Sequence, residues 1–193
     1  LNSSSNNTIT GNTCNNNKET GICLYSSSNN TITGNTCNNN IYNGICLYSD
    51  SNKNTVTGNS CNNNNDTGIY LYSSSNNTIT GNNCNNNIYN GISLESSNNN
   101  TTTGNNCNNN NGTGINLYSS SNNTITGNTC IRGTGQTNDY TSDQYTIILH
   151  GSSHNSHNYN LISSNNCMGK AVVVWGGTGN SVWGNKFDAT NNL

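Results

Sequence analysis

The sequence predicts an all-β solenoid of about eight stacked coils, each of about 23 residues, with a cap at the C-terminal end. The stretch SSSNNTITGNTCNNN at residues 3–17 returns almost letter for letter at residues 26–40, and related copies follow along the chain. Within each copy, apolar and polar residues alternate over short segments bounded by Gly, Asn and Ser. Such alternation is typical of brief strands joined by turns, and not of helices.

Two sequence markers set the period of the repeat. One marker is a cysteine, and the other is the Gly-Ile pair of the motif GIxL. The cysteines fall at positions 14, 37, 61, 84, 107 and 130, and the Gly-Ile pairs begin at positions 21, 44, 68, 91 and 114. A constant period of this length is the signature of a solenoid. The one longer step contains an additional residue in SDSNKN, at residues 49–54, which predicts a turn there.

The apolar residues of one coil are expected to point inward. They are Ile22 and Leu24 of GICL, Ile32 of TIT, and Cys37. Four side chains cannot form a core alone, but coils stacked at a strand spacing of about 4.8 Å form a continuous one. The abundant Asn residues suit the turns, because Asn tolerates a left-handed backbone and its amide can bond to its counterpart one coil away.

The repeat becomes degenerate towards the C-terminus. Residues 1–130 form the regular coils, and residues 131–193 continue the same domain with two predicted loops, at residues 131–145 and 150–158. The last segment contains Trp175, Trp183 and Phe187, which we expect to cover the final apolar edge as an end cap. The chain begins in mid-repeat at Leu1, so we expect that edge to continue in a longer chain or to meet a partner.

Charge and hydropathy exclude several classes of function. The chain has five Lys and Arg residues and seven Asp and Glu residues, for a net charge of −2. Such a surface has no electrostatic footprint for nucleic acid or for anionic lipid. No apolar run reaches the length of a membrane span, and no signal peptide is visible.

The motifs NNTITGN and GIxLY, which recur across residues 6–130 and in degenerate form to residue 187, carry a family resemblance. They resemble the NosD-like, or PbH1-type, repeats of right-handed parallel β-helix proteins. The resemblance implies a right-handed parallel β-helix in a secreted or cell-surface protein. It also implies relatives that bind or process polysaccharide, and one branch of the family is labelled copper-binding.

The TIT motif predicts a surface array of threonines. If its central residue points inward, both flanking threonines point outward. Six coils would then present two columns, about 6.7 Å apart along the strand and about 4.8 Å apart between coils. This pattern resembles the Thr-x-Thr face of β-solenoid antifreeze proteins, although Thr is also a favourable strand residue. The threonines are Thr8, Thr10, Thr31, Thr33, Thr55, Thr57, Thr78, Thr80, Thr101, Thr103, Thr124 and Thr126.

Two further outward columns follow from the repeat. Tyrosines recur as Tyr25, Tyr48, Tyr72 and Tyr118, interrupted by Glu95, and they either cover the sheet or form a surface for sugar binding or assembly. Acceptor motifs for N-glycans recur in the turns, with Lys53 at the matching position of the longer coil. Their asparagines are Asn6, Asn29, Asn76, Asn99 and Asn122.

The nine cysteines fall into two groups. The six that mark the period, together with Cys167, should form an inward column of buried thiols, since side chains that point in parallel are poorly aimed for a disulfide. Cys23 and Cys46 lie between Ile and Leu in GICL and should face outward on neighbouring coils. They are the candidate disulfide or reactive pair.

Chemistry-bearing residues cluster near the two predicted loops. His150, His154 and His157 lie close together, but neither a Cys nor an acidic residue accompanies them at a spacing typical of metal ligands. The other ionisable residues there are Arg132, Asp139 and Asp143. One such loop on a nearly uncharged surface predicts neither a catalytic site nor a cofactor or metal site.

The leading interpretation is a non-enzymatic, extracellular solenoid that acts as a structural or adhesive repeat module and can self-assemble. The first alternative is an ice-binding protein that uses the threonine array. The second is a β-helix protein that binds or modifies polysaccharide. The corresponding partners are copies of the chain, an ice surface and a glycan.

Overall fold

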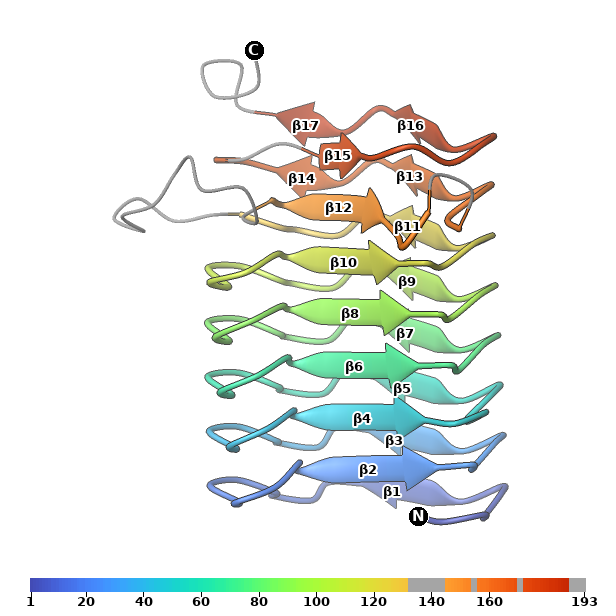
Figure 1. Ribbon diagram of the computed structural model, residues 1–193. Helices are drawn as coiled ribbons and strands as arrows, with labels where there is room; N and C mark the ends of the chain where they lie inside the picture. Colours follow the sequence, from blue (N-terminus) through green and yellow to red (C-terminus); the bar gives the residue numbers. More distant parts are fainter. Residues whose placement is uncertain (132–144, 154–155, 170–171, 188–193) are drawn as a thin grey trace.

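A computed structural model describes residues 1–131, 145–153, 156–169 and 172–187. These residues form short strands and no helix, and they wind into a parallel β-helix (Figure 1). No helix long and apolar enough to cross a membrane occurs among the described residues. The strands are β1 (Thr8–Thr10), β2 (Ile22–Tyr25), β3 (Thr31–Thr33), β4 (Ile45–Tyr48), β5 (Thr55–Thr57), β6 (Ile69–Tyr72), β7 (Thr78–Thr80), β8 (Ile92–Glu95), β9 (Thr101–Thr103), β10 (Ile115–Tyr118), β11 (Thr124–Thr126), β12 (Ile147–His150), β13 (Leu161–Ser163), β14 (Asn166–Cys167), β15 (Val172–Val174), β16 (Ser181–Trp183) and β17 (Lys186–Phe187).

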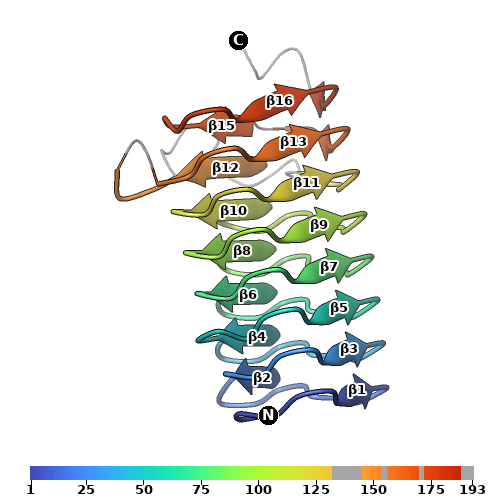
Figure 2. The same cartoon turned by 90° about the vertical axis from the view of Figure 1, so that its right-hand side faces the viewer.

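Two parallel sheets run the length of the molecule (Figure 2). The TxT strands form an eight-stranded sheet in the order β1-β3-β5-β7-β9-β11-β13-β16, and the GIxL strands form a seven-stranded sheet in the order β15-β12-β10-β8-β6-β4-β2. Both sheets cross the boundary at residue 130 without interruption. The eight repeats counted from the sequence therefore give about seven full turns, because the last repeat contributes no described strand to the second sheet.

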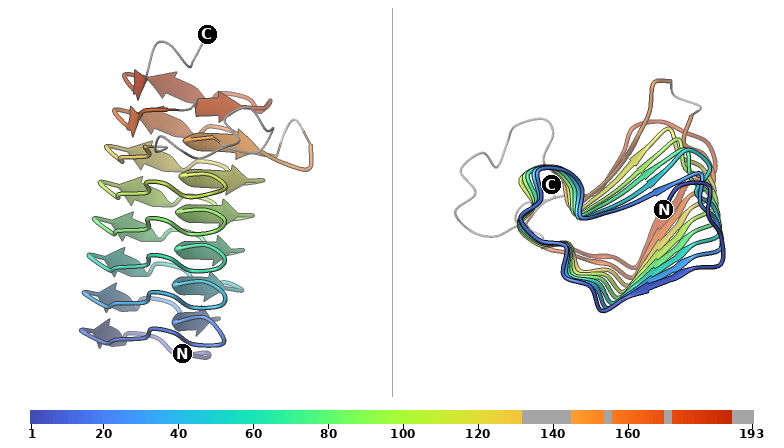
Figure 3. Two further views of the ribbon diagram at one scale, coloured as in Figure 1. Left: turned by 90° about the vertical axis from the view of Figure 1, so that its left-hand side faces the viewer. Right: turned by 90° about the horizontal axis from the view of Figure 1, so that it is seen from below.

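Equivalent residues of neighbouring coils lie directly above one another. Ile9 pairs with Ile32, for example, and Leu24 pairs with Leu47. A third, narrower column of parallel bridges joins the residues that precede the cysteines: Thr13, Thr36, Ser60, Asn83, Asn106, Thr129 and Asn166. Seen along the axis, the coils nest closely on one side and fan out progressively on the other (Figure 3). Because neighbouring coils stay in register, a feature of one coil is repeated as a column along the rod.

The core consists of the predicted inward residues stacked in columns. Leu24, Ile32 and Cys37 are fully buried, and their counterparts in later coils continue one apolar cluster to Ile162 and Cys167. Each coil adds few apolar atoms, but the cluster is continuous because successive strands are close enough for side-chain contact.

Buried asparagine ladders bond each turn to the next, as the sequence predicts. The Oδ1 atom of Asn82 accepts bonds from the backbone N and the Nδ2 of Asn59, at 2.9 and 3.0 Å. The Nδ2 of Asn82 donates to the Val56 carbonyl at 2.9 Å and to the Oδ1 of Asn105 at 2.9 Å. One amide thereby satisfies backbone groups that the turn would otherwise leave unpaired in the interior.

The exposed asparagines have a different role in the turns. Asn6, Asn29, Asn76, Asn99 and Asn122, the five predicted glycan acceptors, all have positive φ angles, between 57° and 61°. Lys53 adopts the same left-handed conformation in the longer coil, with φ of 57°. Asn is the residue type that best tolerates this conformation after Gly. The turn geometry accounts for these asparagines, and glycan occupancy stays a prediction.

The C-terminal tryptophans do not cover the last apolar edge, contrary to the expected cap. Trp183 occupies an outward position of β16 and is 61% exposed, while Val182 beside it, which continues the inward column, is 42% exposed. Trp175 follows β15 and packs on an outer face of the rod. The alternation of a strand explains this result, because Trp183 is one residue away from the inward position. The side chain of Phe187 lies outside the described part of the structure.

Candidate functional site

The eight-stranded sheet carries the predicted threonine array on its outer face. All twelve threonines are exposed or partly exposed, and from β3 to β11 the central residue of each TxT strand is fully buried. Neighbouring coils bond within the array: the hydroxyls of Thr103 and Thr126 lie 3.1 Å apart, and Thr80 Oγ1 donates to the Thr103 carbonyl at 3.0 Å. The array gives way to Leu161 and Ser163 in β13.

The seven-stranded sheet carries the predicted tyrosine column. Tyr25, Tyr48 and Tyr72 lie in register on β2, β4 and β6, and Glu95, Tyr118 and His150 continue the column. The sequence-based prediction did not include Tyr70, which lies in the neighbouring outward column, paired with Cys46. The Tyr70 ring contacts Tyr48 with centroids 5.6 Å apart, and its hydroxyl donates to Glu95 Oε2 at 2.6 Å. Burial is the largest cause that raises the pKa of Tyr70, and the bond to Glu95 adds to it.

A groove of about 630 Å³ opens on the outer face of the same sheet, over β10 and β12. This volume lies within the range of about 300–1,000 Å³ that is typical of small-molecule sites. Asn116 of β10 with Ile148 and His150 of β12 form the floor, and Trp175 lines the side near β15. The remaining lining residues come from the loops before β8 and β10: Ile88, Tyr89, Asn90, Asn111, Gly112 and Thr113.

Contacts along the sheet hold the polar and aromatic groups of the groove. His150 Nε2 lies 2.8 Å from Asn116 Oδ1, and Asn116 Nδ2 donates to Ser93 Oγ at 3.0 Å. Because an amide oxygen can only accept, the Nε2 of His150 is the donor. His150 contacts Tyr118 and Trp175 edge to face, with centroids 5.1 and 5.9 Å apart. Tyr145 contacts the same tryptophan at 5.9 Å.

The loop residues of the groove follow from a repeated sequence motif. The segment NIYNGI occurs at residues 40–45 and again at residues 87–92, and in both copies the Ile-Tyr pair is exposed. Above the second copy, the next coil has Gly112, whose backbone N donates to the Tyr89 carbonyl at 2.8 Å. A Cβ atom at position 112 would lie 2.8 Å from that carbonyl oxygen, so the absence of a side chain permits the close approach.

Of the groove residues, the sequence indicates His150 as a chemistry-bearing residue and predicts Trp175 in the cap. Neither Tyr89 nor Asn116 is predicted, because the groove joins segments that are far apart in the chain. The repetition of NIYN was the available signal.

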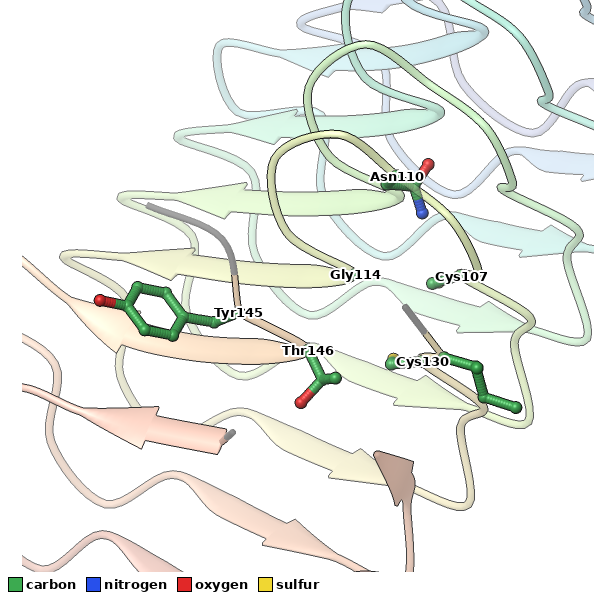
Figure 4. Close-up of a pocket in the computed structure, with 7 residues that line it drawn as sticks. Cys107, Asn110, Gly114, Cys130, Tyr145 and Thr146 are labelled. Carbon is green, nitrogen blue, oxygen red and sulfur yellow. The ribbon is translucent and has the colours of Figure 1, made fainter. Parts of the chain in front are cut away.

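A second, interior pocket is too small for a ligand. It lies between the coils that contain Cys107 and Cys130, and it is also bordered by Asn110, Gly114 and Thr146 (Figure 4). Its volume of about 10 Å³ corresponds to about one water molecule. The outer groove is therefore the candidate site.

The cysteines follow the two predicted groups. The inward thiols from Cys37 to Cys167 are buried, and burial raises the pKa of Cys167 to about 11. Cys23 and Cys46 pair directly across β2 and β4, outside the apolar core. Both are free thiols in the structure. Cys23 is exposed as expected, but Cys46 is 1% exposed, because it lies between Cys23 and Tyr70 on the same face. A disulfide between the two stays a prediction.

The remaining candidate residues are only partly covered by the structure. Arg132, Asp139, Asp143 and His154 lie outside the described residues. His157 is fully buried and His150 faces the groove, so these two histidines occupy different environments. Among the described residues, no group of three His, Cys, Asp or Glu side chains is arranged to hold a metal ion.

Several solved structures share this fold at low sequence identity. The mannuronan C-5 epimerase AlgE6 A-module of Azotobacter vinelandii superposes with a TM-score of 0.76 at 15% identity, over 98% of this chain and 58% of that one. The periplasmic alginate epimerase AlgG gives 0.76 at 17% identity, over 97% and 46%. An alginate lyase from Paenibacillus sp. gives 0.59 at 14% identity, over 96% and 75%.

The chain spans about half the length of the two epimerases. At these identities the superpositions show a shared fold. No curated protein matches the sequence. A family model described as "Right handed beta helix region" matches residues 1–130 and, in a second match, residues 60–192, so the chain belongs to the right-handed β-helix family.

Proposed function

We propose that this β-helix binds polysaccharide in the groove over β10 and β12. The observation that carries the proposal is the grouping of Trp175 and Tyr89 with the amides of Asn90, Asn111 and Asn116 around one concave site. Aromatic rings present an apolar face against which a sugar ring can pack, and amide side chains both donate and accept hydrogen bonds from hydroxyls. A concave site with a few convergent polar groups is the usual form of a ligand pocket.

The comparisons support a polysaccharide ligand more than the structural or adhesive module that the sequence favoured first. Three of the similar solved folds are described as alginate epimerases or as an alginate lyase. The proposal concerns binding, because Asp139 and Asp143, the acidic residues of the sequence-predicted cluster, lie outside the described residues. The proposal includes an extracellular location, because we expect the polysaccharide ligand to occur outside the cell.

Affinity electrophoresis tests the proposal. The protein is run in native gels that contain soluble polysaccharides, both neutral and uronate-rich, and we expect at least one of them to retard it. Trp175→Ala should abolish the retardation, whereas Trp183→Ala, which removes an exposed tryptophan from the other sheet, should leave it unchanged. Equal retardation of all three proteins, or none by any polysaccharide, would refute binding in this groove.

The threonine array favours ice binding as a second candidate function. Six TxT strands present paired threonines in register, and from β3 to β11 the central residue is buried. Thermal hysteresis tests this candidate by comparing wild type with Thr78→Tyr, where a bulky ring in the middle of the array should abolish activity. A wild-type protein that is folded and unglycosylated but shows no hysteresis would eliminate the candidate.

A further inference from the structure

The charge of the groove distinguishes between neutral and acidic glycans. Among the ten described residues that line it there is no Lys, Arg, Asp or Glu, and His150 is the one basic side chain. The described cationic side chains, Lys18, Lys53 and Lys186, lie on other parts of the rod.

A polyuronate carries one carboxylate per sugar. Transfer of such a carboxylate from water into a groove costs free energy unless a cation or several hydrogen-bond donors compensate it. Proteins usually supply Arg or Lys for this purpose, most effectively as a bidentate Arg pair. The whole chain contains five such residues against seven acidic ones, so its net charge of −2 also gives a polyanion no long-range attraction.

The groups that are present suit uncharged hydroxyls instead. The groove contains the amides of Asn90, Asn111 and Asn116, and an amide side chain can both donate and accept. Trp175 and Tyr89 are 48% and 61% exposed, so both rings are accessible to a ligand, and they come from opposite sides of the groove.

We infer that the groove selects a neutral glycan over a polyuronate, which sets this chain apart from the alginate-related proteins that share its fold. The inference rests on the proposed function, because it names the ligand class of the same groove. It requires that binding is determined by packing on aromatic rings and by bonds to hydroxyls, and not by charge.

A matched pair of ligands tests the inference without changing the linkage of the glycan. Alginate oligosaccharides are compared with their carboxyl-reduced, neutral derivatives, alongside neutral glucan and mannan oligosaccharides, by isothermal titration calorimetry. We expect the tightest neutral ligand to bind at least about tenfold more tightly than any uronate, a difference of about 1.4 kcal/mol. Uronates that bind as tightly or more tightly would overturn the inference and leave the proposed function intact. No binding of either class would overturn the proposed function itself.

A charge-gain variant provides the second test. Asn111→Lys exchanges one amide of the groove for a cation, so the ratio of uronate affinity to neutral-glycan affinity should rise several-fold over that of the wild type. Asn65→Lys is the control, because residue 65 holds the equivalent position two coils away: its backbone N donates to Asn40, as that of Asn111 donates to Asn87. An increase of the same size in Asn65→Lys, or none in a folded Asn111→Lys, would contradict selection by charge in this groove.

Discussion

Individual residues carry small departures from the repeat that have measurable consequences. Thr102 occupies the inward position that is Ile in both neighbouring TxT strands. Its side chain is fully buried, and its hydroxyl has no hydrogen-bond partner among the described residues. Burial of an unpaired hydroxyl is unfavourable by about 1–3 kcal/mol.

Replacement of Thr102 by Val should therefore stabilise the protein. The two side chains have nearly the same shape, so Thr102→Val removes the unpaired hydroxyl without opening a cavity, and we expect the free energy of unfolding to rise by about 1–2 kcal/mol. Urea denaturation measures the change. The control is Thr101→Val, an exposed position on the same strand, which should change stability by less than about 0.5 kcal/mol. A Thr102→Val protein no more stable than its control would indicate that the hydroxyl has a partner, such as a buried water.

Cys23 combines an exposed thiol with a lowered pKa. A hydrogen bond from the Cys46 thiol lowers the pKa of Cys23 to about 7, although partial burial acts in the opposite direction. The thiolate is the nucleophile, so Cys23 should react with iodoacetamide at a rate that rises through pH 7 and levels off above it. Cys46→Ala removes the hydrogen-bond donor and should shift this midpoint upward, towards the ordinary value of 9.0. Mass spectrometry of the alkylated native protein measures both profiles, and an unchanged midpoint in Cys46→Ala would exclude the assigned cause.

At the scale of the strand and turn, two kinds of glycine support the coil. Gly68 lies just before β6, and a Cβ atom there would be 2.6 Å from the carbonyl oxygen of Gly91 in the next coil. Gly81 follows β7 with φ of 63°, and a Cβ atom there would meet no atom within 4 Å. The first glycine is required by close packing between coils, whereas the second is required by backbone conformation alone.

Substitution should separate these two requirements. In Gly68→Ala the new methyl group meets a backbone oxygen of the next coil, and a backbone atom cannot move aside as the end of a side chain can. We expect the free energy of unfolding to fall by about 1–3 kcal/mol. Gly81→Asn should be nearly neutral, since Asn adopts the left-handed conformation readily and the space around it is open. Thermal unfolding followed by circular dichroism compares the two variants. A larger loss for Gly81→Asn than for Gly68→Ala would reverse the assignment.

At the scale of the whole molecule, the chain is a one-dimensional stack in which each coil contacts its neighbours. Removal of residues 73–95 deletes one whole coil and joins Tyr72 to Ser96, so every column remains in register. We expect this variant to fold, with a denaturant m-value reduced by about one eighth because less surface is exposed on unfolding. Removal of residues 73–84 deletes half a coil and places core residues outside, so this variant should not fold. Loss of folding in both variants would mean that the coils are not interchangeable.

The repeat by itself determined the solenoid, the inward columns, the asparagine ladders and the outward rows of Thr and Tyr. Each of these depends on the alternation of a strand or on the left-handed preference of Asn and Gly, which are local properties. Because the same sequence recurs in every coil, these local properties recur as well, and one coil predicts the next. Even the buried thiol column follows from Cys37 and its period, because the register of parallel strands preserves it.

The tertiary structure decided the features that join different coils at irregular positions. Trp175, expected at the end of the rod, lies against His150 on its side, and Cys46, expected to be exposed, is buried between Cys23 and Tyr70. Tyr89 and Trp175 line the same groove although β8 and β15 are three coils apart, because the loop before β10 has no bulky side chain at Asn111 and Gly112. Burial on an outer face depends on which neighbours stand above, below and beside a residue. A periodic sequence pattern specifies inward and outward, but not how the outward side chains cover one another.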